Sequence, residues 1–111
     1  MQSRNDFKAC ADRLAMLAEP TRLRIVVRLL DGPKNVSDIC EELGEVIVKV
    51  SHHLKMLKRA NIVEGIKYGR IVIYRLAPDV VEMVEPSKGS PQQLDLGCCQ
   101  LAFAAPSRKA H

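Results

Sequence analysis

Residues 46–59 constrain the fold of this chain more than any other stretch, because their side chains divide between two faces of a helix. At about 100° per residue, aliphatic side chains fall on one side and mostly polar ones on the other. The first side carries Val46, Val50, Leu54 and Leu57; the second carries Val48, His52, Lys55 and Arg59, with Lys49 and Ser51 on its flanks. Such a helix can bury one face and offer the other to phosphate groups. The alternative is an ordinary solvated amphipathic helix.

Composition limits what surrounds this helix. A chain of 111 residues with 47% apolar side chains predicts one small domain whose stability would gain from dimerisation. Aromatic residues make up only 4%, so the core is expected to be aliphatic, and the net charge of +4 is compatible with nucleic acid. No apolar run is long enough to span a bilayer and no signal peptide is seen, which predicts a soluble cytoplasmic protein. Its four cysteines should then be reduced, and serve as core residues, soft-metal ligands or redox sensors rather than structural disulfides.

The residues before the central helix predict three more helices. Apolar side chains recur at three- and four-residue steps over residues 6–17, and Pro20 suits the first turn of a second helix. Ser37 is the expected N-cap of a third helix, which Gly44 closes. Two short helices joined by a tight glycine-containing turn are typical of a helix-turn-helix.

After Asn61 the pattern changes from helical to strand-like. Residues 62–66 and 71–76 predict a β-hairpin with Lys67, Tyr68 and Arg70 at its tip. A hairpin directly after a recognition-type helix is a wing, whose tip could reach a minor groove or a phosphate; the alternative is a solvated turn. The fold class is therefore mainly α with a β-hairpin wing, a dimeric winged helix-turn-helix.

The C-terminal part is expected to consist of several short pieces. Residues 78–85 predict a short last helix, and residues 87–91 have the composition of a linker. The apolar residues that follow, 94–103, should pack on the body or on a partner subunit. We accordingly divide the chain into a DNA-binding and dimerisation domain, residues 1–85, and a linker with a cysteine-containing tail, residues 86–111.

Three segments, residues 17–25, 50–57 and 67–76, carry a resemblance to a known family. Their motifs are Leu-Ala-Glu-Pro-Thr-Arg-Leu-Arg-Ile, Val-Ser-His-His-Leu-Lys-Met-Leu, and Lys-Tyr-Gly-Arg leading to Tyr-Arg-Leu. In this order and spacing the chain resembles the ArsR/SmtB family of small bacterial metal- and thiol-responsive repressors. The resemblance implies a homodimer on a double-stranded DNA operator, released when an inducer binds, with the first and last helices forming the dimer interface. It implies a transcriptional regulator and not an enzyme.

Two recognition helices related by a two-fold axis could read half-sites about one helical turn apart. The expected DNA contacts come from the outer face of the helix and from the wing tip: Lys49, Ser51, His52, Lys55, Tyr68 and Arg70. His53 projects nearer the core and should serve packing or a phosphate. Family members usually have polar residues at positions 46–48, which here are all apolar. The base readout could therefore lean on thymine methyl groups.

Three inducer sites of the family are not supported by this sequence. Where many relatives carry paired cysteines before the turn, the matching residues are Asn35 and Ser37. Asp79 and Glu82 match part of a zinc site on the last helix, but their histidine partners are missing. Persulfide-sensing relatives have a cysteine near the position of Val27.

The remaining candidate is the adjacent pair Cys98 and Cys99 in the tail. Thiolates suit As(III), Sb(III) or a soft metal ion such as Cu(I), Cd(II) or Zn(II), and no resident cofactor is required. A third ligand could be Cys10 or Cys40, Cys40 lying in the expected first turn of its helix. Packing is the alternative for each of these four residues. Two other functions stay open: a redox regulator without metal, and a winged-helix protein-interaction module that binds no DNA.

Overall fold

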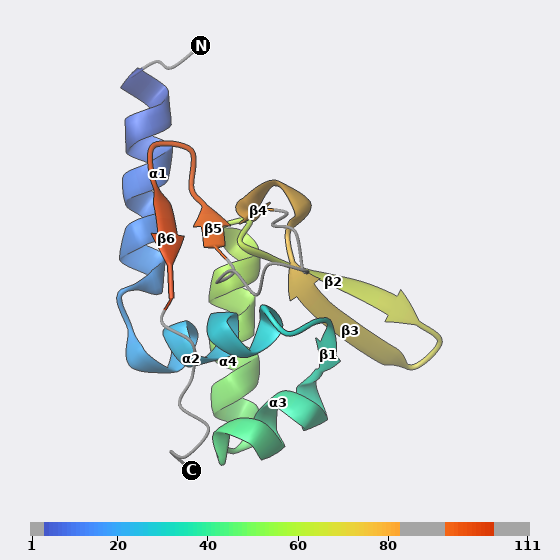
Figure 1. Cartoon of the computed structure of the whole chain (residues 1–111). Coiled ribbons are helices and arrows are strands. Elements are labelled where there is room, and N and C mark those ends of the chain that lie inside the picture. The colour runs from blue at the N-terminus through green and yellow to red at the C-terminus, as the bar shows by residue number, and fades with distance from the viewer. Residues whose placement is uncertain (1–3, 83–92, 104–111) are drawn as a thin grey trace.

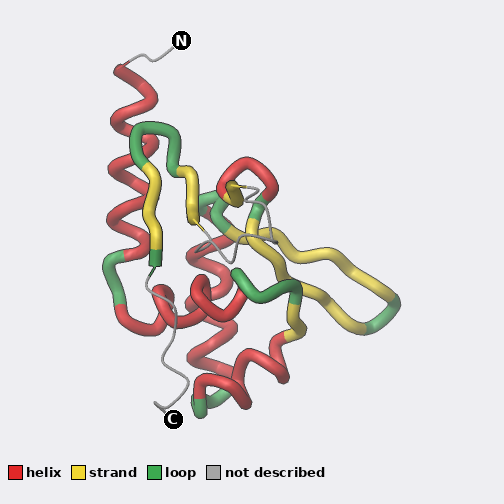
Figure 2. Tube along the Cα trace, viewed as in Figure 1, coloured by secondary structure: helices red, strands yellow, loops and turns green. Residues whose placement is uncertain are grey.

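The computed structural model describes residues 4–82 and 93–103 (Figure 1). Its helices are α1 (Arg4–Leu17), α2 (Pro20–Leu29), α3 (Val36–Leu43) and α4 (Ile47–Arg59), followed by the short 3-10 helix η1 (Pro78–Val80). Its strands are β1 (Lys34–Asn35), β2 (Val63–Tyr68), β3 (Ile71–Leu76), β4 (Val81–Glu82), β5 (Gln93–Asp95) and β6 (Gln100–Ala102). Figure 2 shows that helices dominate the first half and strands the second. No helix within these two ranges has the length and apolar character needed to cross a membrane.

The second helix begins where the sequence predicts, whereas α1 begins at Arg4, two residues before the expected start. Pro20 occupies the first turn of α2, where its missing N–H leaves no hydrogen bond unmade. Glu19 caps this helix, since its carboxylate accepts from the backbone N–H of Arg22. On α1, Cys10 and Leu17 are buried, whereas Phe7 and Leu14 of the same apolar stripe are exposed.

Helices α3 and α4 form the expected pair about a tight turn. Gly44 ends α3 in the left-handed conformation, with φ of +68°. The predicted cap at Ser37 was wrong: Asn35 caps α3, and its side-chain oxygen accepts from the backbone N–H of Asp38. An Asn side chain is as good a cap as Ser, and capping two residues earlier lets Val36 enter the helix. Helix α4 begins at Ile47, and its N-cap Val46 makes no side-chain hydrogen bond.

The predicted wing is present. Strands β2 and β3 pair antiparallel from Val63 with Leu76 out to Tyr68 with Ile71. β1 adds a third strand on the other side of β3, which links the start of α3 to the wing. In Figure 1 the β2–β3 hairpin projects away from the helices. Four helices with this hairpin confirm a winged helix-turn-helix, mainly α in content.

The C-terminal part differs from its prediction. The helix expected over residues 78–85 is instead the single turn η1 followed by strand β4. Val81 is β-branched and takes an extended conformation, and it pairs with Leu94 of β5. This strand pairing replaces the helix. Residues 83–85, the predicted linker 87–91 and the domain boundary at 85/86 lie outside the described residues.

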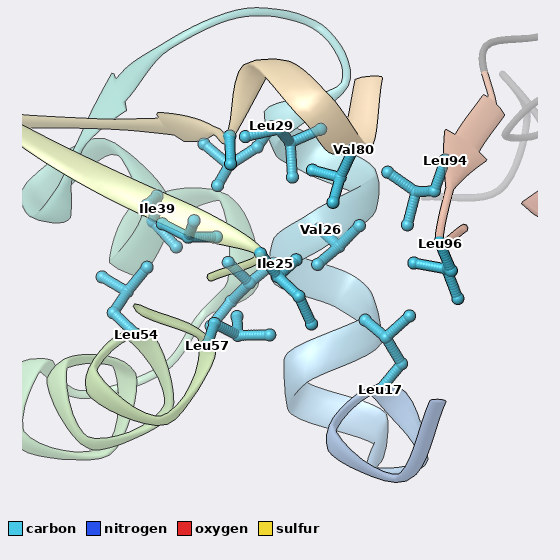
Figure 3. Packing of buried hydrophobic residues seen from close by; sticks show 14 of the residues in the cluster. Leu17, Ile25, Val26, Leu29, Ile39, Leu54, Leu57, Val80, Leu94 and Leu96 are labelled. Carbon is cyan, nitrogen blue, oxygen red and sulfur yellow. The ribbon is translucent and has the colours of Figure 1, made fainter. Parts of the chain in front are cut away.

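The tail packs on the body, one of the two predicted alternatives, and does so as a hairpin. β5 pairs with β4 on one side and β6 on the other. Leu94 and Leu96 are 0% and 2% exposed and join the core. Figure 3 shows them on the side of the cluster where Val80, Val26 and Leu17 lie. The core of the described residues is aliphatic, as the composition indicated.

Candidate functional site

The outer face of α4 is the first part of the site. Val50, Leu54 and Leu57 hold the inner face in the core, with exposures of 1% or less. The four expected contact residues of this helix, Lys49, Ser51, His52 and Lys55, are all exposed on the other face. The ammonium of Lys49 lies 3.4 Å from the carboxylate of Glu45 one turn earlier, so a phosphate would compete with that ion pair.

The wing tip is the second part. Tyr68 and Arg70 are exposed on either side of Gly69, at the end of the hairpin farthest from the helices. A phenol and a guanidinium on a projecting hairpin can both donate to phosphate oxygens. The same exposure fits a solvated turn, so DNA contact by these two residues stays a prediction, as it does for the four on α4.

His53 lies on the buried side of α4, as predicted, and is 8% exposed. Its Nδ1 lies 3.1 Å from Nη1 of Arg22 and 3.8 Å from Oε1 of Glu19. Burial lowers the pKa of His53, while the Glu19 carboxylate opposes that shift and the Arg22 guanidinium adds to it. The neutral ring can then accept a hydrogen bond from Arg22.

Arg22 joins three elements, a role that sequence reasoning missed. Its Nε donates to the carbonyl of Met16 in α1, while its Nη1 reaches His53 of α4. The backbone N–H of Arg22 also holds the Glu19 carboxylate and thereby lowers the pKa of Glu19. The end of α1 is therefore connected by hydrogen bonds to the recognition helix. The only available signal was the Glu-Pro-Thr-Arg motif itself.

The third part is a cluster of three sulfur atoms between α1 and the tail hairpin. The ligand atoms of Cys10, Cys98 and Cys99 all lie within 4.8 Å of one another. Cys10 is fully buried on α1, and the other two are half-buried in the β5–β6 turn. Gly97, with φ of +100°, allows that turn, and the N–H of Leu96 donates to the carbonyl of Cys99 across it. This turn lies against α1, since its two cysteines approach Cys10.

Two cysteines of this cluster are bonded. Cys10 and Cys98 form a disulfide, with Cα atoms 5.9 Å apart, and the Cys99 sulfur lies 3.8 Å from that of Cys10. The expectation that all four cysteines are reduced therefore does not describe this structure. The physical reason is proximity: the apolar stripe of α1 turns Cys10 toward the hairpin, and packing of Leu94 and Leu96 brings Cys98 over it.

Cys40, the other candidate third ligand, is not part of the cluster. It is a free, half-buried thiol in α3. Because α3 begins at Val36, Cys40 lies in its second turn and not in the expected first turn. Asp79, at the zinc-site position of some relatives, instead forms an ion pair of 3.3 Å with Arg13.

Comparison with known proteins places these features in a family. Residues 19–65 match the model for bacterial regulatory proteins of the arsR family. The HTH-type transcriptional regulator NmtR of Mycobacterium tuberculosis is 34% identical over 88 residues, which cover 78% of this chain and 73% of that protein. The arsenical resistance operon repressor of Escherichia coli is 38% identical over 66 residues, which cover 59% of this chain and 56% of that protein.

A solved structure agrees. The homodimeric winged helix-turn-helix DNA-binding domain Mb0332 of Mycobacterium bovis superposes with a TM-score of 0.62 at 29% identity. The match covers 68% of this chain and 73% of that one. The resemblance read from three short motifs is thereby confirmed, and the matching proteins are regulators of transcription rather than enzymes.

Proposed function

Because this chain belongs to the ArsR family of bacterial DNA-binding transcriptional regulators, we propose that it is a homodimeric repressor released from its operator by a thiol-binding metalloid or metal ion. The observation that supports an inducer site is that the sulfur atoms of Cys10, Cys98 and Cys99 lie within 4.8 Å of one another. As a regulator of bacterial transcription it would act in the cytoplasm, where the operator is.

Arsenite is the inducer that we favour, because the donor set is sulfur alone. Three reduced cysteines and As(OH)₃ would give a trithiolate complex and three molecules of water, with no change of oxidation state. Thiolates are soft donors and select soft ions over Mg²⁺ or Ca²⁺. The similarity to the E. coli arsenical resistance operon repressor supports the same choice. Sb(III), Cu(I), Cd(II) and Zn(II) are the other candidates.

The dimer would use the exposed apolar side chains of α1. Phe7 and Leu14 are 62% and 38% exposed on the helix that also carries Cys10. The Mycobacterium bovis domain is homodimeric, which supports the same assembly here. The helix expected to complete the interface is absent from residues 78–82, so the β5–β6 hairpin beside α1 would take its place.

Inducer binding would reach the DNA through α1. Cys10 and the two tail cysteines would hold the ion and thereby tie the hairpin to α1, and Arg22 connects the end of α1 to His53 on α4. A shift of α1 would therefore change the spacing of the two recognition helices in the dimer. An operator with half-sites about one turn apart tolerates little change of that spacing.

The test is arsenite titration of reduced protein bound to a fluorescent duplex from the promoter of its own gene. We expect the parent and Cys40→Ser, the matched control, to release the duplex at the same arsenite concentration. Cys98→Ser/Cys99→Ser should stay bound. Release of the double variant at the parent's concentration would rule out the cysteine cluster as the inducer site.

The Cys10–Cys98 disulfide favours a second candidate, a redox-responsive regulator. Two thiols would pass two electrons and two protons to a peroxide, which is reduced to water or alcohol. Cys99→Ser separates the two functions, because oxidation needs only Cys10 and Cys98 whereas a trithiolate needs all three. If Cys99→Ser still leaves DNA on peroxide treatment but no longer on arsenite, both responses exist in one site.

A further inference from the structure

The start of α4 presents an unusual apolar surface. Val46, Ile47 and Val48 are 67%, 54% and 77% exposed, and Val48 is the most exposed large hydrophobic residue among those described. We call these three residues the apolar tip. Each is β-branched, so its side chain has little rotational freedom and keeps a fixed shape.

The apolar tip lowers the stability of the protein when no partner is bound. Val46 occupies the N-cap of α4 without a side-chain hydrogen bond, where Asn, Asp or Ser would satisfy a free backbone N–H. The exposed apolar surface gains nothing from burial in the isolated chain. A partner that covers this surface would explain why it is apolar.

The position of the tip indicates which partner that is. In a helix-turn-helix the N-terminal residues of the recognition helix face base edges in the major groove. Val48 lies one helical turn before Ser51 and His52 and two turns before Lys55, all exposed on the same face. The tip is therefore continuous with the surface expected to meet DNA.

Within the major groove, the only apolar group on a base edge is the C5-methyl of thymine. We propose that the apolar tip reads thymine methyl groups and that Val48 is the principal contact. This inference rests on the DNA-binding part of the proposed function and is independent of the inducer.

The exposed cations that follow the tip favour DNA as its partner. Lys49 lies directly after the tip and Lys55 two turns beyond Val48 on the same exposed face, whereas Glu45, the acidic residue before the tip, is partly buried and paired with Lys49 at 3.4 Å. Phosphates on both sides of a major groove complement these cationic side chains. This complementarity of charge favours DNA as the occupant.

The experiment replaces each thymine of the operator duplex, one at a time, with deoxyuridine, which lacks only the methyl group. We expect about fourfold weaker binding by the parent protein at the contacted positions, the effect of one buried methyl. Val48→Ala should bind the thymine and deoxyuridine duplexes equally at one or more of these positions. Ile71→Ala, a matched control at an exposed position of the wing, should keep the parent's discrimination.

Two outcomes would overturn the inference. One is salt-sensitive duplex binding that no deoxyuridine substitution weakens. The other is a Val48→Ala variant that keeps the full discrimination, or that changes the sedimentation of the protein without DNA, since the tip would then face another copy. A protein that binds no duplex from its own promoter would instead refute the proposed function. Val48→Ala should still be released from DNA by the same arsenite concentration as the parent, because the tip and the inducer site act independently.

Discussion

Leu94→Ala should uncouple the tail hairpin from the rest of the protein without unfolding it. The Leu94 side chain is 0% exposed, and replacing a fully buried Leu with Ala costs about 3 kcal/mol. β5 and β6 have three residues each, too few to hold a hairpin together by themselves. In the reduced protein the loss should appear as local detachment of residues 93–103.

The consequence would be weaker arsenite binding. Detachment moves Cys98 and Cys99 away from Cys10, so binding must first restore the docked hairpin. Since about 1.4 kcal/mol corresponds to a factor of ten, arsenite affinity should fall by up to about a hundredfold. Ultraviolet absorption of the arsenic–thiolate bonds, titrated in competition with a small dithiol, would measure it.

Leu43→Ala is the matched control, because Leu43 is also buried but lies in α3, away from the hairpin (Figure 1). This variant should lose the full free energy of the cavity on global unfolding, which lowers its urea midpoint. Its arsenite affinity at low denaturant should stay unchanged. Leu94→Ala should lower the midpoint less. Equal arsenite affinities for the two variants and the parent would show that hairpin docking does not build the site.

Three further results are expected. Burial lowers the pKa of His53 below its ordinary value of 6.5 despite Glu19, so the folded state favours the neutral ring. The contribution of His53 to the free energy of unfolding is fully present above pH 6.5. It is lost as the pH falls through the pKa of His53 in the folded state. Urea midpoints should therefore drop as the pH is lowered below 6.5, and drop less in His53→Gln; an equal drop in the two proteins would contradict this assignment. Gly44→Ala should cost about 1 kcal/mol, measured by urea unfolding, because the left-handed backbone disfavours a side chain although nothing lies within 4 Å of the added Cβ; no cost would be contrary. Arg70→Ala should weaken duplex binding evenly across sequences and reduce the salt slope by about one, as measured by anisotropy; an altered base preference would contradict a phosphate contact.

The four α-helices and the turns that end them could be predicted from the sequence, because they depend on neighbouring residues. The spacing of apolar side chains located the helices, and Pro20 and Gly44 marked a beginning and an end. Asn61, after which the helical pattern was expected to end, follows α4 in the left-handed conformation, with φ of +60°. These features depend on residues a few positions apart, which a sequence displays directly.

The rest depends on partners far along the chain. Val81 pairs with Leu94, so a strand forms where a helix was expected. No residue near Val81 in the sequence indicates that pairing. Likewise, Cys10 and Cys98 are 88 positions apart, so the choice between Cys10 and Cys40 as the third ligand stayed open. The cluster exists because α1 and a hairpin from the other end of the chain pack on the same core.

This closure of the chain has a consequence for biosynthesis. Helix α1 leaves the ribosome well before the hairpin that covers Cys10, because the hairpin lies at the far end of the element order. The helix-turn-helix and wing can fold in the meantime, because domains form as the chain is made. In a newly made molecule the helix-turn-helix and wing can therefore form before the cysteine cluster does. During that interval the thiol of Cys10 is open to the solvent and to any electrophile in it.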